Sequence, residues 1–153
     1  MNQIKVVLLN ENAATPTRNK STDAGLDLYA SADIFIPFAE TRVIPTSVAI
    51  GVPSGYVGKI EDRSSLASKG LRTGGGVVDH GYTGEVKVVI HNITNVDFGE
   101  IDLKTIENPG YQIKKGDKIA QLLLYRIETP SVILVDSLEE SERGIYGFGS
   151  SGR

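Results

Sequence analysis

The sequence predicts an all-β protein, an antiparallel sandwich or barrel with one short helix. Three observations support this class: apolar, often β-branched segments recur along the chain, Pro, Gly, Asn and Asp separate them at close spacing, and helical periodicity is scarce. A chain of 153 residues, 40% of them hydrophobic, fits a single domain with a sizeable core.

The expected strands alternate with turn sequences. Turns are expected at Gly51–Gly55 and at Lys114–Asp117, where Gly, Pro and Asp cluster. One segment, Val86–Ile90, partly alternates apolar and polar residues, as a strand with one solvated face does. In chain order the strands are Ile4–Leu9, Val43–Val52, Tyr56–Ile60, Val86–Ile90, Ile119–Ile127 and Val132–Val135.

The one helical segment is Ser64–Gly70, where one or two turns could begin at Ser64 as the N-cap and stop at Gly70. The preceding Arg63 adds a guanidinium to the two hydroxyls of Ser64 and Ser65 and to the unpaired backbone N–H groups of a helix start. These groups suit a phosphate, although for this segment taken alone a plain helix cap is the simpler explanation, since serine-rich helix starts are common.

A glycine run, Gly74–Gly76, leads into Val77–Asp79 and then into a further strand. We expect a tight β-hairpin here, with Asp79 near the end of its first strand. Taken alone, Asp79 could be no more than a turn-forming residue.

The C-terminal residues differ from the rest of the chain, which gives a division into a β-domain (1–142) and an arm (143–153). The arm holds four glycines and few side chains that could pack, and ordering glycine carries a high entropic cost. It is either a frayed tail or a flexible arm that orders over a ligand through Phe148 and its two arginines.

Composition excludes several classes of protein. The absence of cysteine rules out disulfides and thiolate metal sites and fits a reducing cytoplasm, which is the location we expect. A net charge of −3 argues against nucleic-acid binding. We expect no membrane span and no signal peptide, since no apolar run approaches the ~20 residues a membrane helix needs.

Five segments, taken together and in order, resemble the five motifs of the trimeric dUTPases. They span nearly the whole chain, and their order is more specific than any one of them. The segments are Ala24–Leu28, Arg63–Lys69, Gly76–Glu85, Gly116–Leu122 and Arg143–Gly152.

The resemblance implies a distorted jelly-roll (β-clip) barrel that assembles as a homotrimer, with three active sites at subunit interfaces. The second and fourth motifs, the third, and the fifth would come from different chains. The implied activity is hydrolysis of dUTP to dUMP and pyrophosphate with Mg²⁺.

By the same resemblance, Asp79 would be the catalytic residue. It would bind the deoxyribose 3′-OH and orient the water that attacks the α-phosphorus, since a carboxylate accepts hydrogen bonds from both. Tyr82 would stack beneath the sugar and leave no room for a ribose 2′-OH. The uracil edge would be bound by the backbone at Gly76, Val77, Val78 and Lys87.

The phosphates and the metal would lie against the other motifs. Asp27 would contact Mg²⁺ through its water shell. The α- and β-phosphates would be held by Arg63, Ser64, Ser65 and Gln121. The arm would close as a lid, with Phe148 stacked on uracil, Arg143 and Ser150 on the γ-phosphate, and Gly149 as a further substrate-binding position.

The chain departs from the family pattern at a few positions. Asp62 stands where Pro is usual and adds a negative charge beside Arg63; Ser65 and Tyr146 replace Gly, and Thr83 replaces Arg. The stretch 93–110 is longer than usual and is expected to be a surface insertion.

Two alternatives remain. A dCTP deaminase shares the Arg63–Ala67 sequence, but the position of its catalytic Glu, three residues before Asn92, is Val89 here, and valine cannot transfer protons. A non-catalytic, nucleotide-binding regulatory protein of the same fold is the other. Pyrophosphate release and deamination, measured on dUTP and dCTP, would separate all three.

Overall fold

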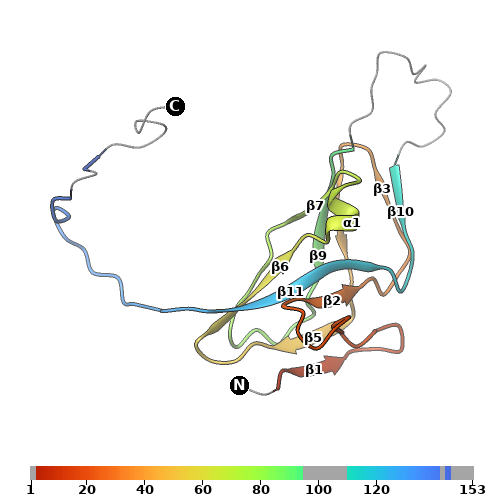
Figure 1. The fold of residues 1–153 in the computed structure, drawn as a ribbon, viewed down its shortest axis with the longest axis horizontal. Coiled ribbons are helices and arrows are strands. Elements are labelled where there is room, and N and C mark those ends of the chain that lie inside the picture. The colour runs from red at the N-terminus through yellow and green to blue at the C-terminus, as the bar shows by residue number, and fades with distance from the viewer. Residues whose placement is uncertain (1–2, 95–109, 142–143, 146–153) are drawn as a thin grey trace, which may run out of the picture.

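The computed structural model describes residues 3–94, 110–141 and 144–145. Strands dominate these residues, and the one helix among them is short (Figure 1). In chain order the elements are β1 (Lys5–Leu8), β2 (Leu26–Tyr29), β3 (Ile34–Pro37), β4 (Thr41–Ile44), β5 (Val48–Gly51), β6 (Tyr56–Glu61), α1 (Ser64–Ala67), β7 (Leu71–Gly74), β8 (Val77–Val78), β9 (Val88–Asn92), β10 (Gly110–Ile113) and β11 (Lys118–Arg126).

The strands form small sheets in which every pair is antiparallel. The largest has the order β2-β11-β6-β8, and the others are β4-β9-β7, β1-β5 and β10-β3. The long strand β11 is the centre of the first sheet, because it pairs with β2 along one edge and with β6 along the other. The predicted all-β class with one short helix, a distorted jelly roll, is confirmed.

Strand alternation decides which side chains reach the core and which face outward. In β2, Leu26 and Leu28 are buried, so Asp27 between them points to the opposite face of the strand. Each fully buried Leu or Ile contributes roughly 1.5–3 kcal/mol relative to an exposed one. The core also takes in Ile36, Ile44, Ile50, Ile90, Ile113, Ile119 and Leu122.

The prediction of one strand over Val43–Val52 is wrong. The segment breaks at Pro45–Ser47 into β4 and β5, which lie in different sheets. Pro45 has no N–H to donate to a ladder, and Ser47 turns the chain with a φ of 55°. The outcome is a sharp corner between two strands rather than one long strand.

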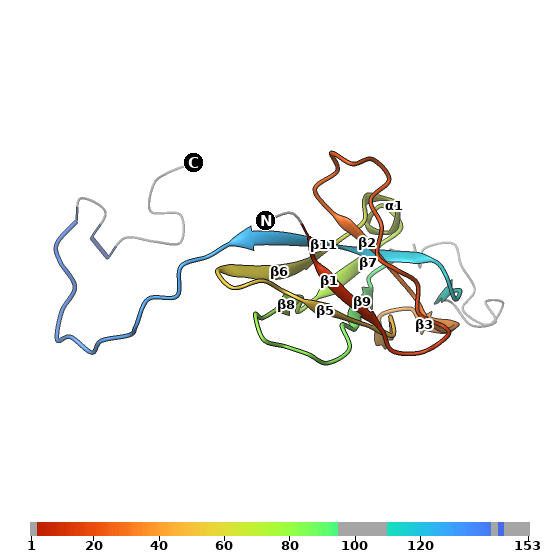
Figure 2. The same cartoon turned by 90° about the horizontal axis from the view of Figure 1, so that it is seen from below.

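The last predicted strand, Val132–Val135, is also absent. The chain leaves β11 and runs away from the sheets in both ribbon views (Figures 1 and 2). The Val132 and Leu134 side chains are 97% and 101% exposed. A β-branched segment needs a neighbouring strand to form a sheet, and no described residue lies beside this one as a partner strand.

The predicted hairpin is wrong in its pairing, although Asp79 does follow directly on the strand β8. That strand pairs with β6, whereas β9 pairs with β4 and β7. Before β9 begins, Glu85 bridges Ala49 of β5 and the Val86 N–H bonds the Val48 carbonyl. The residues after Asp79 therefore form a loop that runs from one sheet to another.

The helix forms where it is expected, but its N-cap is Arg63 rather than Ser64. No side chain caps it, and Gly70, with a φ of 76°, follows the helical turn as predicted. The turns at Gly51–Gly55 and Lys114–Asp117 are confirmed by their backbone hydrogen bonds. No helix among the described residues has the length and apolar character to cross a bilayer.

Candidate active site

One cavity collects residues from three of the five motif segments. We call it the Arg63 pocket; its volume is about 440 Å³. It contains all the residues predicted to hold the α- and β-phosphates and the metal. Its lining is Asn19, Asp23, Ala24, Gly25, Asp27, Arg63, Ser64, Ser65 and Gln121.

Sheet register explains why residues so distant in sequence meet here. In the largest sheet, Gln121 of β11 stands opposite Asp27 of β2 on one side and opposite Glu61 of β6 on the other. Arg63 follows two residues after Glu61, at the start of α1. The convergence is therefore a property of three paired strands, which hold it more rigidly than loops would.

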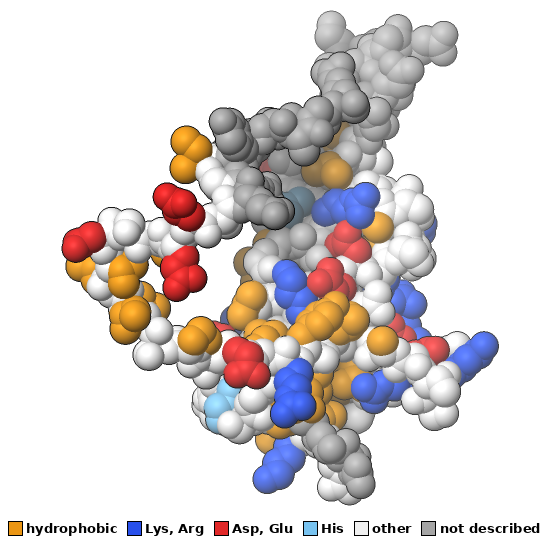
Figure 3. Space-filling model, turned by 60° about the vertical axis from the view of Figure 1, so that its left-hand side comes forward, with side chains coloured by type: hydrophobic (Ala, Val, Ile, Leu, Met, Phe, Trp, Pro, Cys, Tyr) orange, Lys and Arg blue, Asp and Glu red, His pale blue; other side chains and the backbone are white. Residues whose placement is uncertain are grey.

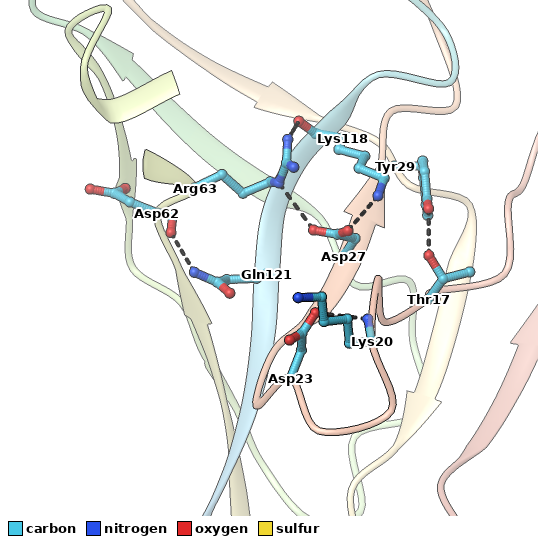
Figure 4. Close-up of polar contacts among 9 residues, drawn as sticks. All are labelled: Thr17, Lys20, Asp23, Asp27, Tyr29, Asp62, Arg63, Lys118 and Gln121. Carbon is cyan, nitrogen blue, oxygen red and sulfur yellow. Dashed lines mark hydrogen bonds and ion pairs between the residues drawn. The ribbon is translucent and has the colours of Figure 1, made fainter. Parts of the chain in front are cut away.

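Asp27 lies between two cations (Figure 4). Its carboxylate pairs with the Arg63 Nε at 3.0 Å and with the Lys118 Nζ at 2.7 Å. The Arg63 Nη1 also donates to the Lys118 carbonyl oxygen at 3.1 Å, which fixes the plane of the guanidinium. Hydrogen bonding to Asp27 raises the pKa of Lys118 above its ordinary value. Asp27 is thus held in place while Arg63 keeps donors for an anion.

The amide of Gln121 is oriented by the backbone around it. Its Nε2 donates to the Asp62 carbonyl oxygen at 2.8 Å. Its Oε1 lies over Gly25, where a Cβ would come within 2.3 Å of that oxygen. Any larger residue at position 25 would push the amide out of the pocket, which gives a physical reason for the glycine of this segment.

The extra carboxylate beside Arg63 is turned away from the pocket. Asp62 pairs with the Arg72 guanidinium at 2.8 Å and accepts bonds from the Thr73 N–H and hydroxyl. Figure 4 shows the Asp62 and Arg63 side chains pointing in opposite directions. Burial alone would raise the pKa of Asp62, but the hydrogen bonds from Arg72 and Thr73 lower it below 3.8. The negative charge of Asp62 is therefore compensated by Arg72 of β7, away from the Arg63 pocket.

This arrangement predicts a stabilising role for Asp62. Asp62→Ala leaves the partly buried Thr73 N–H without its acceptor and should lower the free energy of unfolding by about 1–3 kcal/mol. A lowered folded-state pKa stabilises the protein above the unfolded pKa, and that stability is lost as the pH falls through the folded value.

In urea unfolding, the gap between wild type and Asp62→Ala should therefore shrink as the pH drops below about 4. The matched control is Glu40→Ala, which removes an exposed ion pair with Arg42 and should cost less than about 1 kcal/mol. A gap that stays constant down to pH 2 would contradict the assignment.

A second cavity, of about 380 Å³, lies at the end of β8; we call it the Asp79 pocket. It contains every residue of the third motif that was predicted for the sugar and uracil, and Lys87. The Gly76 carbonyl accepts from the Ile60 N–H at 2.8 Å, which anchors the glycine run on β6. The lining is Ile60, Gly76, Val77, Val78, Asp79, Tyr82, Glu85, Val86 and Lys87.

The Asp79 carboxylate is exposed, and within residues 3–94 and 110–141 no group hydrogen-bonds or pairs with it. Its backbone carbonyl accepts from the Tyr82 N–H at 3.2 Å, which closes a turn directly after β8. A carboxylate with free lone pairs at a pocket wall can accept a proton or a hydrogen bond from a ligand or a water.

Sequence reasoning missed three charged residues: Asp23 and Glu85, which line the Arg63 and Asp79 pockets, and Lys118, which pairs with Asp27. Lys118 and Glu85 both lie inside the quoted motif segments, but nothing in the sequence shows that Lys118 reaches Asp27 or that Glu85 enters the Asp79 pocket. The predicted arm residues Arg143, Phe148, Gly149 and Ser150 lie outside the described residues, as does nearly all of the 93–110 stretch.

The donor set fits a magnesium ion that takes few ligands from protein. In the described part of the chain no three His, Cys, Asp or Glu side chains gather into a metal cage. Asp27 lines the Arg63 pocket with both oxygens already bonded to cations, so its remaining lone pairs suit a hydrogen bond from a metal-bound water. Mg²⁺ usually keeps several waters and takes phosphate oxygens beside one or two carboxylates.

An all-β fold with one pocket that presents an arginine, two serine hydroxyls and an amide, and a second pocket that presents an unpaired carboxylate, defines a class, the small β-proteins suited to bind phosphorylated ligands. The particular family follows from comparison with known proteins. The chain belongs to the dUTPase family, whose model matches residues 11–152.

Curated relatives match this chain over nearly its full length. The chain is 46% identical to the deoxyuridine 5′-triphosphate nucleotidohydrolase of Saccharomyces cerevisiae, covering 97% of this chain and 94% of the yeast enzyme. It is 44% identical to the deoxyuridine 5′-triphosphate nucleotidohydrolase of Candida glabrata, and the match covers 99% of this chain and 98% of that enzyme.

Solved structures share the fold. The dUTPase of Staphylococcus bacteriophage 80alpha with dUpNHpp superposes with a TM-score of 0.86 at 37% identity, covering 100% of both chains. A mutant dUTPase of phage phi11 of S. aureus, described with a structural Mg(II) ion, superposes with a TM-score of 0.78 at 37% identity. The match covers 91% of this chain and 100% of the phage chain.

Proposed function

We propose that this protein hydrolyses dUTP to dUMP and pyrophosphate, with Asp79 activating the attacking water. One observation carries the proposal: four motif segments far apart in sequence fold into two pockets, one presenting the Arg63 guanidinium beside serine hydroxyls and one holding an unpaired carboxylate. Membership of the dUTPase family and the names of full-length relatives support the same reaction.

The Arg63 pocket is the phosphate side of this proposal. Arg63 and Gln121 supply charged and amide donors, and α1 begins without a capping side chain, so the serine hydroxyls and N–H groups there are open to a ligand. Charge-assisted bonds to phosphate oxygens are about twice as strong as neutral ones. These groups would align the triphosphate chain for attack.

The Asp79 pocket is the nucleoside side. Asp79 accepts a proton from water as the water oxygen bonds to the α-phosphorus, and the bond from that phosphorus to the bridging oxygen breaks, releasing pyrophosphate. Backbone groups at Gly76, Val78 and Lys87 face the base. Backbone donors aimed at O4 of uracil meet an amino group in cytosine, a mismatch that a buried site rejects by a factor of ~10⁴.

Magnesium would belong beside Asp27. Bound there, it would supply positive charge against the phosphate oxygens. The protein's part is to hold the Asp27 carboxylate where a metal-bound water can donate to it, which the pairs with Arg63 and Lys118 do. The structural Mg(II) ion of the phi11 relative supports a dependence on magnesium only indirectly and does not bear on the place of the ion.

A homotrimer would complete the site. A nucleotide must contact both pockets at once, yet the two share no lining residue, which suits a site built from more than one subunit. The segment after β11 also carries exposed apolar side chains, Val132, Leu134 and Leu138 among them. Figure 3 shows hydrophobic side chains on a part of the chain that stands away from the body. Covering such side chains against a second copy would stabilise an oligomer.

Tyr82 is the proposed gate against ribose. Tyr82→Ala should reduce the preference for dUTP over UTP, because the ring would no longer fill the space a 2′-OH needs. The ratio of kcat/KM values for dUTP and UTP measures the effect. The control is Tyr125→Ala, an exposed tyrosine on β11 that lines neither pocket. An unaltered ratio in Tyr82→Ala would place the gate elsewhere.

The deciding experiment is pyrophosphate release from dUTP and dCTP with Mg²⁺, beside an assay for deamination, with size-exclusion light scattering on the same sample. We expect pyrophosphate from dUTP alone, no deamination, and a trimer's mass. Deaminated product would support the deaminase alternative, and nucleotide binding without turnover would support the regulatory alternative.

The location of the activity is proposed to be the cytoplasm, because a chain without cysteine fits a reducing compartment.

A further inference from the structure

The loop from Asp79 to Glu85 places Tyr82, but packing does not hold the ring. Its side chain is 48% exposed. The hydroxyl donates to the Glu85 backbone carbonyl at 2.9 Å, and the ring folds back over Gly84, where a Cβ would come within 2.5 Å of the hydroxyl oxygen. The position of the ring therefore follows the position of the Glu85 backbone.

The Glu85 backbone is held on one side by its bridge to Ala49 of β5, and the Glu85 side chain adds a second attachment. Its Oε1 accepts from the Ser47 N–H at 2.8 Å, and its Oε2 lies 3.5 Å from the Lys87 Nζ. The carboxylate is only 22% exposed, so it is held at the pocket wall rather than solvated. Pairing with Lys87 also offsets a negative charge that would otherwise oppose a triphosphate.

Ser47, which anchors Glu85, is a rigid point of the fold. It is 6% exposed, sits in the left-handed region at the corner between β4 and β5, and donates its hydroxyl to Ser31 at 2.8 Å. Asn10 donates to the same hydroxyl at 2.9 Å. A fixed corner of the core is thus connected through Glu85 to the ring of Tyr82.

We propose that Glu85 is a positioning residue that sets the selectivity of the enzyme for deoxyribose over ribose, by fixing Tyr82 against the sugar. The inference rests on the proposed function, since it concerns the sugar of the same nucleotide. Glu85 touches neither the reacting phosphorus nor the attacking water. It acts through the Ser47 contact and the Tyr82 contact.

The test compares Glu85→Ala with Glu85→Gln in the full-length protein. Alanine keeps the backbone bridge to Ala49 but leaves the Ser47 N–H without an acceptor, so the Glu85 carbonyl that holds Tyr82 is less firmly placed and the dUTP/UTP ratio of kcat/KM should fall by about tenfold. Glutamine keeps an oxygen for Ser47 and should stay within about twofold of wild type. The control, Glu40→Gln on an exposed pair with Arg42, should leave the ratio unchanged.

A purely structural role would lower kcat/KM for both nucleotides by the same factor and leave the ratio intact, which would overturn the proposal. If Glu85→Ala does not fold, Tyr82→Phe gives an independent answer, because it keeps the ring and removes the donor to the Glu85 carbonyl. Its ratio should also fall, and an unchanged ratio would overturn the proposal. A wild type that releases no pyrophosphate from dUTP would instead contradict the proposed function.

Discussion

Asp79→Asn should lower kcat for dUTP by at least ~10² while leaving the affinity for a non-hydrolysable dUTP analogue close to that of wild type. Asparagine has the same shape and can still accept a hydrogen bond from the sugar, but it cannot take a proton from water. Asp79 is the one carboxylate of its pocket that has no partner among the described residues, since Glu85 is engaged by Ser47 and Lys87.

The measurement is a pre-steady-state and steady-state comparison of pyrophosphate release, beside calorimetric titration with the analogue. Asp33→Asn serves as the matched control, because it makes the same substitution at a surface pair with Lys114 that lines neither pocket. Turnover of Asp79→Asn near the wild-type rate would remove the residue from its catalytic role, whereas lost analogue binding would assign it to affinity alone.

Much of the fold could be predicted because strand and turn chemistry is local. The β-branched runs at β1, β6 and β11, and the turns rich in Gly, Pro and Asp, were all identifiable from their residues. Four strands were not predicted: β2, β3, β7 and β10. They are short, and β2, with the sequence Leu-Asp-Leu-Tyr, shows too few residues for its alternation to be distinguished from a loop.

Strand partners could not be predicted, because the period of two in a strand fixes which face a side chain takes and not which strand lies beside it. That is why β8 was expected to pair with the strand that follows Asp79 and pairs with β6 instead. The break at Pro45–Ser47 has the same origin: the apolar pattern runs through it, while the backbone turns to another sheet.

In the site, too, the residues could be predicted from the sequence, whereas their contacts could not. Motif order brought out Asp27, Arg63 and Gln121 as candidates, and the register of β2, β11 and β6 explains how they meet. The contacts that orient them depend on tertiary structure. Lys118 reaches Asp27 because it stands opposite Tyr29 in the ladder, and Asp62 turns from Arg63 because Arg72 and Thr73 of β7 lie behind it. Neither contact has a signature in the chain.

Ending the chain at Glu142 should abolish most of the activity and spare folding. The core ends well before this point: after Leu124, no residue of the described chain belongs to it or packs against it. The removed segment, 143–153, carries Phe148 for stacking on the base and Arg143 and Ser150 for the γ-phosphate, as the family resemblance implies. Stacking alone contributes ~1–3 kcal/mol.

The truncated protein should therefore keep the wild-type circular dichroism spectrum, and its melting temperature should change little, while kcat/KM for dUTP falls steeply. Phe148→Ala, which keeps the arm and removes only the ring, should lose a smaller part of kcat/KM, in line with a single stacking contact. The difference between the two losses of kcat/KM separates the effect of closing the arm from the effect of base stacking by Phe148. Closing a site also expels water and aligns the reacting groups. Unchanged kinetics in the truncated chain would show that both pockets bind and hydrolyse the nucleotide without any cover.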